Sequence, residues 1–110
     1  MDYEAILTRK LRSLFPDEKK RNEVKAVLDT YGTEAYEKEP LRVRLAILKL
    51  SDSDPDEIKR TTDFAKQDYR DILSWAEYPR QSKKWSMPDG PKKKKLIEAD
   101  RTEYEDWLST

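Results

Sequence analysis

Residues 41–50 read Leu-Arg-Val-Arg-Leu-Ala-Ile-Leu-Lys-Leu and form the most apolar stretch of the 110-residue chain. The first five residues alternate as in a β-strand, but the apolar run that follows breaks the alternation. Helical spacing fits better, because Val43, Ile47 and Leu50 then share one face. Pro40 suits the first turn of a helix, where its missing N–H group is not needed. We therefore expect this stretch to form the central helix of an all-α fold.

The segments on both sides of this stretch are also patterned for helices. Residues 2–14 and 17–31 each carry apolar side chains at steps of three and four. Asp54 and Pro55 form the strongest helix start of the chain, and the apolar spacing continues from there up to the next proline. Together with the central stretch, these segments predict a small bundle of four helices.

Charge divides the chain into three parts, although 23 basic and 23 acidic side chains leave a formal net charge of zero. Residues 80–95 carry a charge of +6, from seven basic side chains and one aspartate. Residues 96–110 carry −4, from five acids and one arginine, so residues 1–79 carry −2 by difference. We interpret the three parts as a helical bundle domain, a flexible basic linker and an amphipathic tail.

The predicted tail has an apolar face, but its charges oppose a lone helix. Lysines precede its N-terminus and acids crowd its C-terminal part, the reverse of what the helix dipole favours. We therefore expect residues 96–110 to be disordered, or helical only when docked on the bundle, on a second copy or on a partner. The candidate partner-binding residues are Tyr78, Trp85, Leu96, Ile97, Tyr104, Trp107 and Leu108.

The composition excludes several kinds of chemistry, because the chain contains no cysteine and no histidine. Disulfides, thiolate nucleophiles, imidazole acid–base catalysis and ordinary structural zinc sites all need one of these residues. We expect a protein that is not an enzyme and uses no cofactor. No apolar run approaches the roughly 20 residues that cross a bilayer, and the acidic start differs from a signal peptide. The expected location is the cytoplasm, without membrane contact.

Two groups of side chains are candidates for other functions. Lys92, Lys93, Lys94 and Lys95 are candidate phosphate contacts for a nucleic acid, although no platform of stacking aromatic residues accompanies them. Asp68 and Asp71 lie three positions apart in one predicted helix. Two neighbouring carboxylates are a candidate carboxylate-dependent enzyme or metal site.

A structural role is the preferred interpretation of the same aspartates. Ion pairs between the third and fourth predicted helices would orient the bundle and account for these charges without any catalysis. The residues expected in these ion pairs are Arg42, Arg44, Asp68, Arg70 and Asp71.

Two segments resemble a group of small uncharacterised bacterial helical proteins. They are Arg-Val-Arg-Leu-Ala-Ile-Leu-Lys-Leu-Ser at 42–51 and Asp-Tyr-Arg-Asp-Ile-Leu-Ser-Trp-Ala-Glu-Tyr-Pro at 68–79. The resemblance implies a bacterial, cytoplasmic setting and brings no activity or catalytic residue with it. Our leading hypothesis is a non-enzymatic interaction or adaptor protein that binds another protein or a second copy of itself. A nucleic-acid accessory role and a carboxylate-dependent enzyme or metal site are the alternatives.

Overall fold

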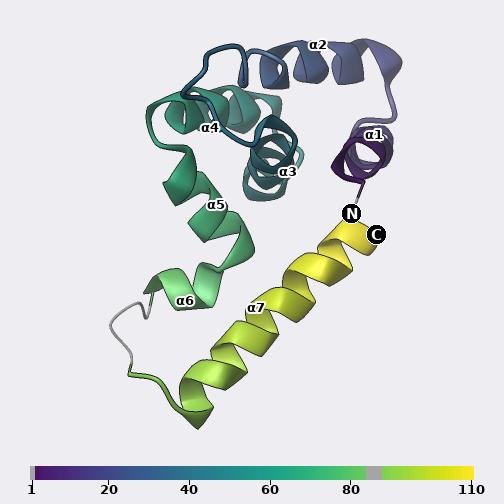
Figure 1. Cartoon of the computed structure of the whole chain (residues 1–110). Helices are drawn as coiled ribbons and strands as arrows, with labels where there is room; N and C mark the ends of the chain where they lie inside the picture. Colours follow the sequence, from purple (N-terminus) through teal and green to yellow (C-terminus); the bar gives the residue numbers. More distant parts are fainter. Residues whose placement is uncertain (1, 84–87) are drawn as a thin grey trace.

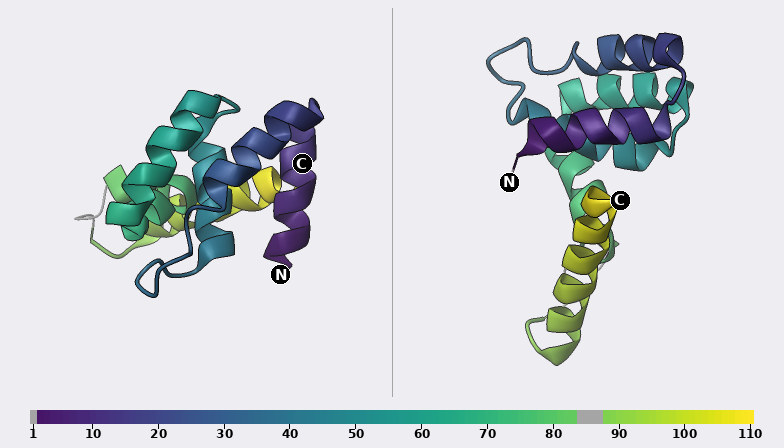
Figure 2. Two further views of the ribbon diagram at one scale, coloured as in Figure 1. Left: turned by 90° about the horizontal axis from the view of Figure 1, so that it is seen from above. Right: turned by 90° about the vertical axis from the view of Figure 1, so that its right-hand side faces the viewer.

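The computed structural model describes residues 2–83 and 88–110, which form seven helices and no strand (Figure 1). The helices are α1 Tyr3–Leu14, α2 Glu18–Leu28, α3 Pro40–Ser51, α4 Pro55–Gln67, α5 Tyr69–Glu77, α6 Pro79–Lys83 and α7 Pro91–Ser109. The first five helices make a compact body, and α6 and α7 form an arm that extends away from it (Figures 1 and 2). The all-α prediction is confirmed. A bundle of four helices is not confirmed, because the described residues contain seven.

Helix α3 is the centre of the body, as its apolar sequence predicts. It packs against α1, α4 and α5. Five of its residues are at most 1% exposed, namely Val43, Leu45, Ala46, Ile47 and Leu48. Burial on all sides explains why this stretch has little polar surface, since each neighbouring helix covers a different face of α3.

The loop between α2 and α3 is tightly organised around a buried carboxylate. Glu37 is 6% exposed, and its Oε1 accepts hydrogen bonds from the backbone N–H groups of Gly32, Thr33 and Glu34. Gly32 has a φ of +101°, and a Cβ there would lie 2.6 Å from Cβ of Pro40. Burial acts to raise the pKa of Glu37, but these backbone hydrogen bonds keep it below its usual value. The Glu37 carboxylate therefore has a structural role in the loop between α2 and α3.

The long fourth helix predicted to follow Asp54 is wrong, because the chain breaks at Asp68. That residue has an extended backbone, with φ −151° and ψ 91°. It ends α4 and begins α5, where its side chain accepts a hydrogen bond from Arg70 N at 3.1 Å. A short acidic side chain can replace the missing helical partner of a backbone N–H group, so aspartate is a favoured start of a new helix. Asp68 and Asp71 therefore do not lie on one face of one helix.

The C-terminal segment is helical in the structure and docks on the body of its own chain. Helix α7 packs against α1, α5 and α6. Its buried residues Asp100, Tyr104 and Leu108 recur every four positions and form one stripe. Of the states expected for residues 96–110, the structure therefore shows the helix docked on the body. The segment predicted as a flexible linker contains α6 and the first turn of α7.

The unfavourable charges of α7 are compensated at its C-terminal end by another helix. Arg9 of α1 donates a hydrogen bond to the carbonyl oxygen of Leu108, and Lys10 donates one to Oγ1 of Thr110 at 3.0 Å. Cations at a helix C-terminus interact favourably with the helix dipole. The docked position thus supplies the positive charge that the sequence of α7 lacks there. In the described part of the chain, no helix combines the length and the apolar composition that a bilayer crossing requires.

Candidate functional site

The docked α7 buries several residues that the sequence marks as partner contacts. Tyr104 and Leu108 are only 8% and 5% exposed, and Trp107 is half-buried against the core. The ammonium group of Lys10 lies 4.3 Å from the centre of the Trp107 ring. Tyr104, Trp107 and Leu108 therefore contact the chain's own body in this structure. In place of the contact with a partner that the sequence predicts for these residues, the structure shows an intramolecular contact.

The other predicted contact residues remain on the surface or outside the described residues. Tyr78 is 43% exposed at the end of α5, and Ile97 is 42% exposed on α7. Leu96 is half-buried beside it. Trp85 lies outside the described residues. Of these residues, Tyr78 lines one cavity together with Tyr104 and Leu108, whereas Leu96 and Ile97 do not line it.

Asp100, the most deeply buried charged side chain among the described residues, joins α6 and α7. The Asp100 side chain is fully buried, and its oxygens accept hydrogen bonds from Arg80 N at 3.2 Å and Gln81 N at 3.1 Å. Nη1 of Arg80 and Nε2 of Gln81 each add a hydrogen bond of 3.0 Å. Burial acts to raise the pKa of Asp100, but these hydrogen bonds from Gln81 and Arg80 together hold it below its usual value. We call this contact the Asp100 latch.

The sequence analysis missed Asp100, although a signal was present. Asp100 lies four residues before Tyr104 and eight before Leu108, on the same stripe of the helix. An acid on a stripe that is otherwise apolar predicts a buried carboxylate that needs several donors. All the described hydrogen bonds of the Asp100 carboxylate come from Arg80 and Gln81 of α6. The carboxylate therefore holds α6 and α7 together and is a structural contact.

Arg42 forms the predicted ion pair of the third helix, but with a different acid. Its Nε and Nη2 donate to the two carboxylate oxygens of Glu77 at 2.8 and 2.6 Å, and its Nη1 donates to Glu39 at 3.0 Å. Glu77 is 6% exposed. The hydrogen bond to Glu77 is the main reason that the pKa of Arg42 is raised, so the guanidinium stays charged. The pair joins α3 to α5 as a two-point contact.

A cavity of about 230 Å³ lies beside this ion pair, between α1, α3, α5 and α7. Its lining includes Tyr3, Arg42, Glu77, Tyr78 and Tyr104. Burial raises the pKa of the Tyr104 phenol, and the negative charge of Glu77 raises it further. Tyr104 therefore stays protonated at neutral pH, and Glu77 is already bound to Arg42. The buried carboxylate of this cavity is thus engaged in an ion pair, and Glu105 lines the cavity from the exposed side of α7.

The remaining predicted ion pairs differ from the expected ones. Arg44 reaches back to α2, where its guanidinium donates to the carbonyl oxygens of Leu28 and Tyr31 at 3.2 and 2.6 Å. Nη1 of Arg44 lies 3.9 Å from a carboxylate oxygen of Asp29. Among the described residues, Arg42 and Arg44 therefore pair with Glu77, Glu39 and Asp29, and not with the expected Asp68 and Asp71.

Asp68 and Asp71 do not form a shared carboxylate site. Asp68 caps α5 and lies 3.8 Å from Nε of Arg70 in an exposed pair. Asp71 is exposed in the first turn of α5, and the described residues show no ion pair for it. Across residues 2–83 and 88–110, no group of three or more acidic residues is arranged to hold a metal ion.

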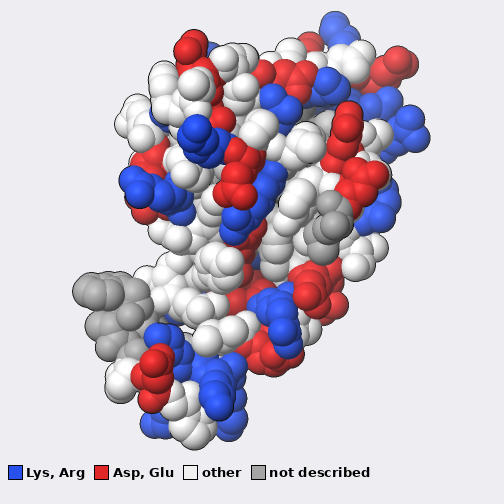
Figure 3. Space-filling view, in the orientation of Figure 1, with Lys and Arg blue, Asp and Glu red and all other residues white. Residues whose placement is uncertain are grey.

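The four candidate phosphate contacts lie at the free end of the arm. Lys92, Lys93, Lys94 and Lys95 occupy the first turns of α7, where blue side chains gather in Figure 3. Lys93 pairs with Asp89 at 2.9 Å. Successive helical residues are about 100° apart, so four consecutive lysines surround the helix and define no single binding face.

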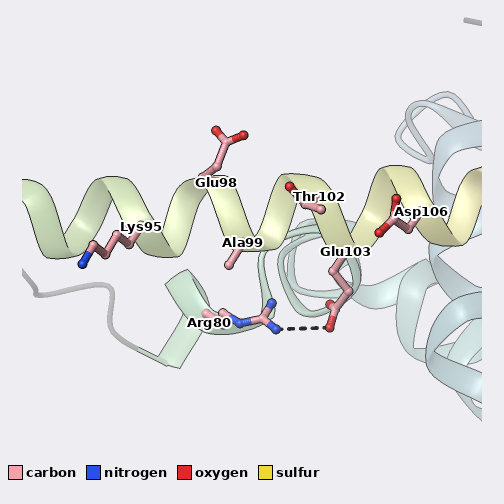
Figure 4. A pocket seen from close by; sticks show the side chains of 7 residues that line it. All are labelled: Arg80, Lys95, Glu98, Ala99, Thr102, Glu103 and Asp106. Atoms are coloured by element: carbon pink, nitrogen blue, oxygen red, sulfur yellow. Dashed lines mark hydrogen bonds and ion pairs between the residues drawn. The ribbon is translucent and has the colours of Figure 1, made fainter.

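The open hollow beside α6 and α7 is mixed in charge. It has a volume of about 670 Å³ and is lined by Arg80, Lys95, Glu98, Ala99, Thr102, Glu103 and Asp106 (Figure 4). Its acids outnumber its basic residues. Arg80 is already bound to Asp100 and lies 3.5 Å from Glu103. The hollow therefore does not suit a phosphate.

An apolar groove with exposed aromatic side chains lies between α4 and α5. It has a volume of about 230 Å³ and is lined by Leu50, Arg60, Thr61, Phe64, Ile72 and Trp75. We call it the α4–α5 groove. Phe64 and Trp75 are 38% and 45% exposed, and their ring centroids lie 5.3 Å apart. The apolar spacing along the fourth predicted helix puts Trp75 close beside its core-facing stripe and predicts that it is mostly buried, so its exposure is a correction.

The break at Asp68 creates this groove. In one straight helix, residues 64 and 75 would be separated by about 16 Å along the axis, because each residue adds about 1.5 Å. Since α4 and α5 instead pack against each other, the two rings come into contact. The sequence analysis treated the segment as continuous and therefore missed the groove.

Comparison of the chain with protein-family models, with curated protein sequences and with solved structures finds no match.

Proposed function

We propose that this protein is a non-enzymatic interaction protein of the bacterial cytoplasm that binds a partner protein through the α4–α5 groove. The observation that carries the proposal is the exposed, contacting ring pair of Phe64 and Trp75 over an apolar cavity. Large aromatic side chains supply most of the binding energy at many protein interfaces, particularly tryptophan. A rigid aromatic pair also loses little conformational entropy when a partner binds.

The state of the buried carboxylates supports an interaction role over a carboxylate-dependent reaction. Glu37, Glu77 and Asp100 are each bound by several donors of the same chain. A general acid or base needs a proton that it can exchange with a substrate. These three groups are instead engaged in holding helices and a loop in place.

The proposal is tested by photo-crosslinking from inside the groove. A benzophenone-bearing phenylalanine replaces Phe64, and the protein is irradiated in the cells that naturally make it. We expect a discrete covalent adduct with one partner, because the groove holds that partner against position 64. The control carries the same group in place of Tyr36, which is 65% exposed on the α2–α3 loop. Identical adduct patterns from both positions would contradict the proposal.

A nucleic-acid accessory role is the second candidate, and it is favoured by the position of the lysines. Residues 88–95 carry four lysines and one aspartate at the projecting end of the arm. Binding through lysines releases counterions and therefore weakens steeply as salt rises. Fluorescence anisotropy with a labelled single-stranded oligonucleotide tests this role at low and moderate salt.

The matched variants for that test change the same charge at two places. One replaces Lys92, Lys93, Lys94 and Lys95 by glutamine. The other replaces four exposed lysines of the body by glutamine, namely Lys19, Lys20, Lys38 and Lys59. A specific role for the arm predicts that only the first variant loses binding and salt dependence. Equal losses would show attraction to net charge alone.

A further inference from the structure

The shape of the α4–α5 groove limits what can enter it. Its lining includes Ile72, which is 1% exposed, and the contacting rings of Phe64 and Trp75. A dry apolar cavity of about 150 Å³ is large enough for a benzene ring. The volume of about 230 Å³ therefore accepts one large aliphatic or aromatic side chain.

The charge of the groove lining determines which ligand residues can lie next to that apolar side chain. Arg60 is the charged residue among those that line the groove, and its side chain is 71% exposed. Within the described residues it pairs with Glu57, three positions earlier on the same helix. Exposed pairs of this kind contribute little to stability, because water screens them and both side chains are flexible. An incoming carboxylate can therefore bind the Arg60 guanidinium in a two-point contact.

We propose that the α4–α5 groove binds a peptide segment of a partner protein that carries a large apolar residue with an aspartate or glutamate within one helical turn. The apolar side chain enters the groove beside the contacting rings of Phe64 and Trp75, and the carboxylate binds Arg60. This inference rests on the proposed function and adds the chemistry of the partner to it.

The inference is tested by selecting binders from a random peptide display library with the complete chain. We expect enriched sequences that share a Leu, Ile, Phe or Trp residue and an acidic residue no more than about four positions away, one helical turn. The most enriched peptide is then synthesised with a fluorescent label, and its dissociation constant is measured by fluorescence anisotropy.

Charge variants then separate the acidic contact from general electrostatics. Arg60→Glu should weaken the peptide by about tenfold, whereas Lys59→Glu, the same charge change on the neighbouring exposed residue, should change it by less than about twofold. Replacing the acidic residue of the peptide by lysine should restore binding to the Arg60→Glu variant. These charge variants remove no apolar contact from the core, so the test does not depend on a destabilised fold.

Three results would overturn the inference, and they are distinguishable from failure of the proposed function. Peptides without a shared acidic residue, or equal effects of Arg60→Glu and Lys59→Glu on binding, would show that the partner does not bind through a carboxylate. Peptide binding that depends on Trp75 would then still support the groove as the binding site. A dimer seen by analytical ultracentrifugation and lost in Trp75→Ala would make a second copy the occupant. No Trp75-dependent peptide at all would overturn the inference, and crosslinking from position 64 would then decide the proposed function separately.

Discussion

Two apolar surfaces of this protein differ in whether the chain covers them. At the contact of α7 with the body, Tyr104 and Leu108 are buried, whereas in the α4–α5 groove Phe64 and Trp75 remain 38% and 45% exposed. Both surfaces are aromatic, so hydrophobicity alone does not explain the difference. The covered surface also has directional polar contacts from Arg9 and Lys49 of the body, and the fully buried Asp100 holds α7 on α6 beside it. Apolar burial is non-directional, and it is the hydrogen-bonded groups that select where the chain's own helix docks.

Lys49 is a further polar contact at the surface that α7 covers. Its ammonium group donates to the carbonyl oxygen of Ala76 at 2.6 Å and to Glu103 at 3.1 Å. It therefore joins α3, α5 and α7 at one point. In the groove, by contrast, Arg60 pairs only with Glu57 of its own helix among the described residues. The groove thus keeps an exposed cation beside an apolar cavity.

Replacing Asp100 by alanine should have the largest effect on this comparison. The change removes the acceptor of four hydrogen bonds and leaves the backbone N–H groups of Arg80 and Gln81 without their partner. We expect the free energy of unfolding to fall by about 2–4 kcal/mol, measured by urea denaturation. Glu98→Ala is the control, because Glu98 is exposed on the same helix and should change stability by less than about 1 kcal/mol. Equal effects of the two variants would contradict the latch.

The latch should also depend on pH, with an effect somewhat smaller than its complete removal. The pKa of Asp100 is lower in the folded state than its ordinary value of about 3.9. The Asp100 carboxylate therefore stabilises the folded state fully at pH values above its ordinary pKa. This stabilisation is lost as the pH falls below the ordinary pKa toward the folded-state pKa. The difference in thermal midpoint between the wild type and Asp100→Asn should be constant near neutral pH and shrink below about pH 4. A difference that grows in acid would show the opposite sign of linkage.

The two tryptophans of the comparison should differ in their effect on stability. Trp107→Ala removes a half-buried ring together with its contact to Lys10, and should cost about 2 kcal/mol. Trp75→Ala removes a ring that is 45% exposed, and should cost less than about 1 kcal/mol. Chemical denaturation of both variants measures the difference. The reverse order would mean that the groove, and not the α7 contact, holds the fold together.

The smallest expected effect concerns a hydroxyl group at the α7 contact. Within the described residues, Oη of Tyr104 is buried and has no hydrogen-bond partner. Tyr104→Phe should therefore leave stability unchanged or raise it by up to about 1 kcal/mol. Tyr31→Phe is the matched control, because its hydroxyl donates to the carbonyl oxygen of Lys38 at 2.9 Å and its loss should cost about 1 kcal/mol. Similar losses in both variants would contradict the unpaired state of Tyr104.

Local sequence signals predicted those parts of the fold that depend on neighbours in the chain. Pro40 begins α3, and Asp54 with Pro55 begins α4, where the Asp54 side chain accepts a hydrogen bond from Asp56 N at 3.0 Å. The break at Asp68 was missed because the apolar spacing continues across it with no proline or glycine. An aspartate there can continue a helix at small cost or start a new one. Packing of α5 against α3 and α4 selects the second outcome.

The candidate site was less predictable than the helices. Sequence patterns indicate aromatic residues as contact candidates, but they place Trp75 in the core and leave open whether Tyr104 and Leu108 contact the bundle, a second copy or a partner. Helical spacing gives the relative direction of side chains on one helix, and it does not say which face another helix covers. The ring contact between Phe64 and Trp75 depends on two helices folding against each other, so no local pattern contains it.

The sequence by itself determined an all-α chain, the buried central helix at 40–51, and the absence of cysteine and histidine chemistry. These properties follow from composition and from periodicity, which act within one helix. Only the tertiary structure decided that α7 docks on its own body and that the α4–α5 groove stays open. The physical reason is that Arg9 and Lys49 of the body donate hydrogen bonds to α7 residues far away in the chain, while Asp100 holds α7 on the preceding helix α6, and these contacts decide which apolar surface is covered.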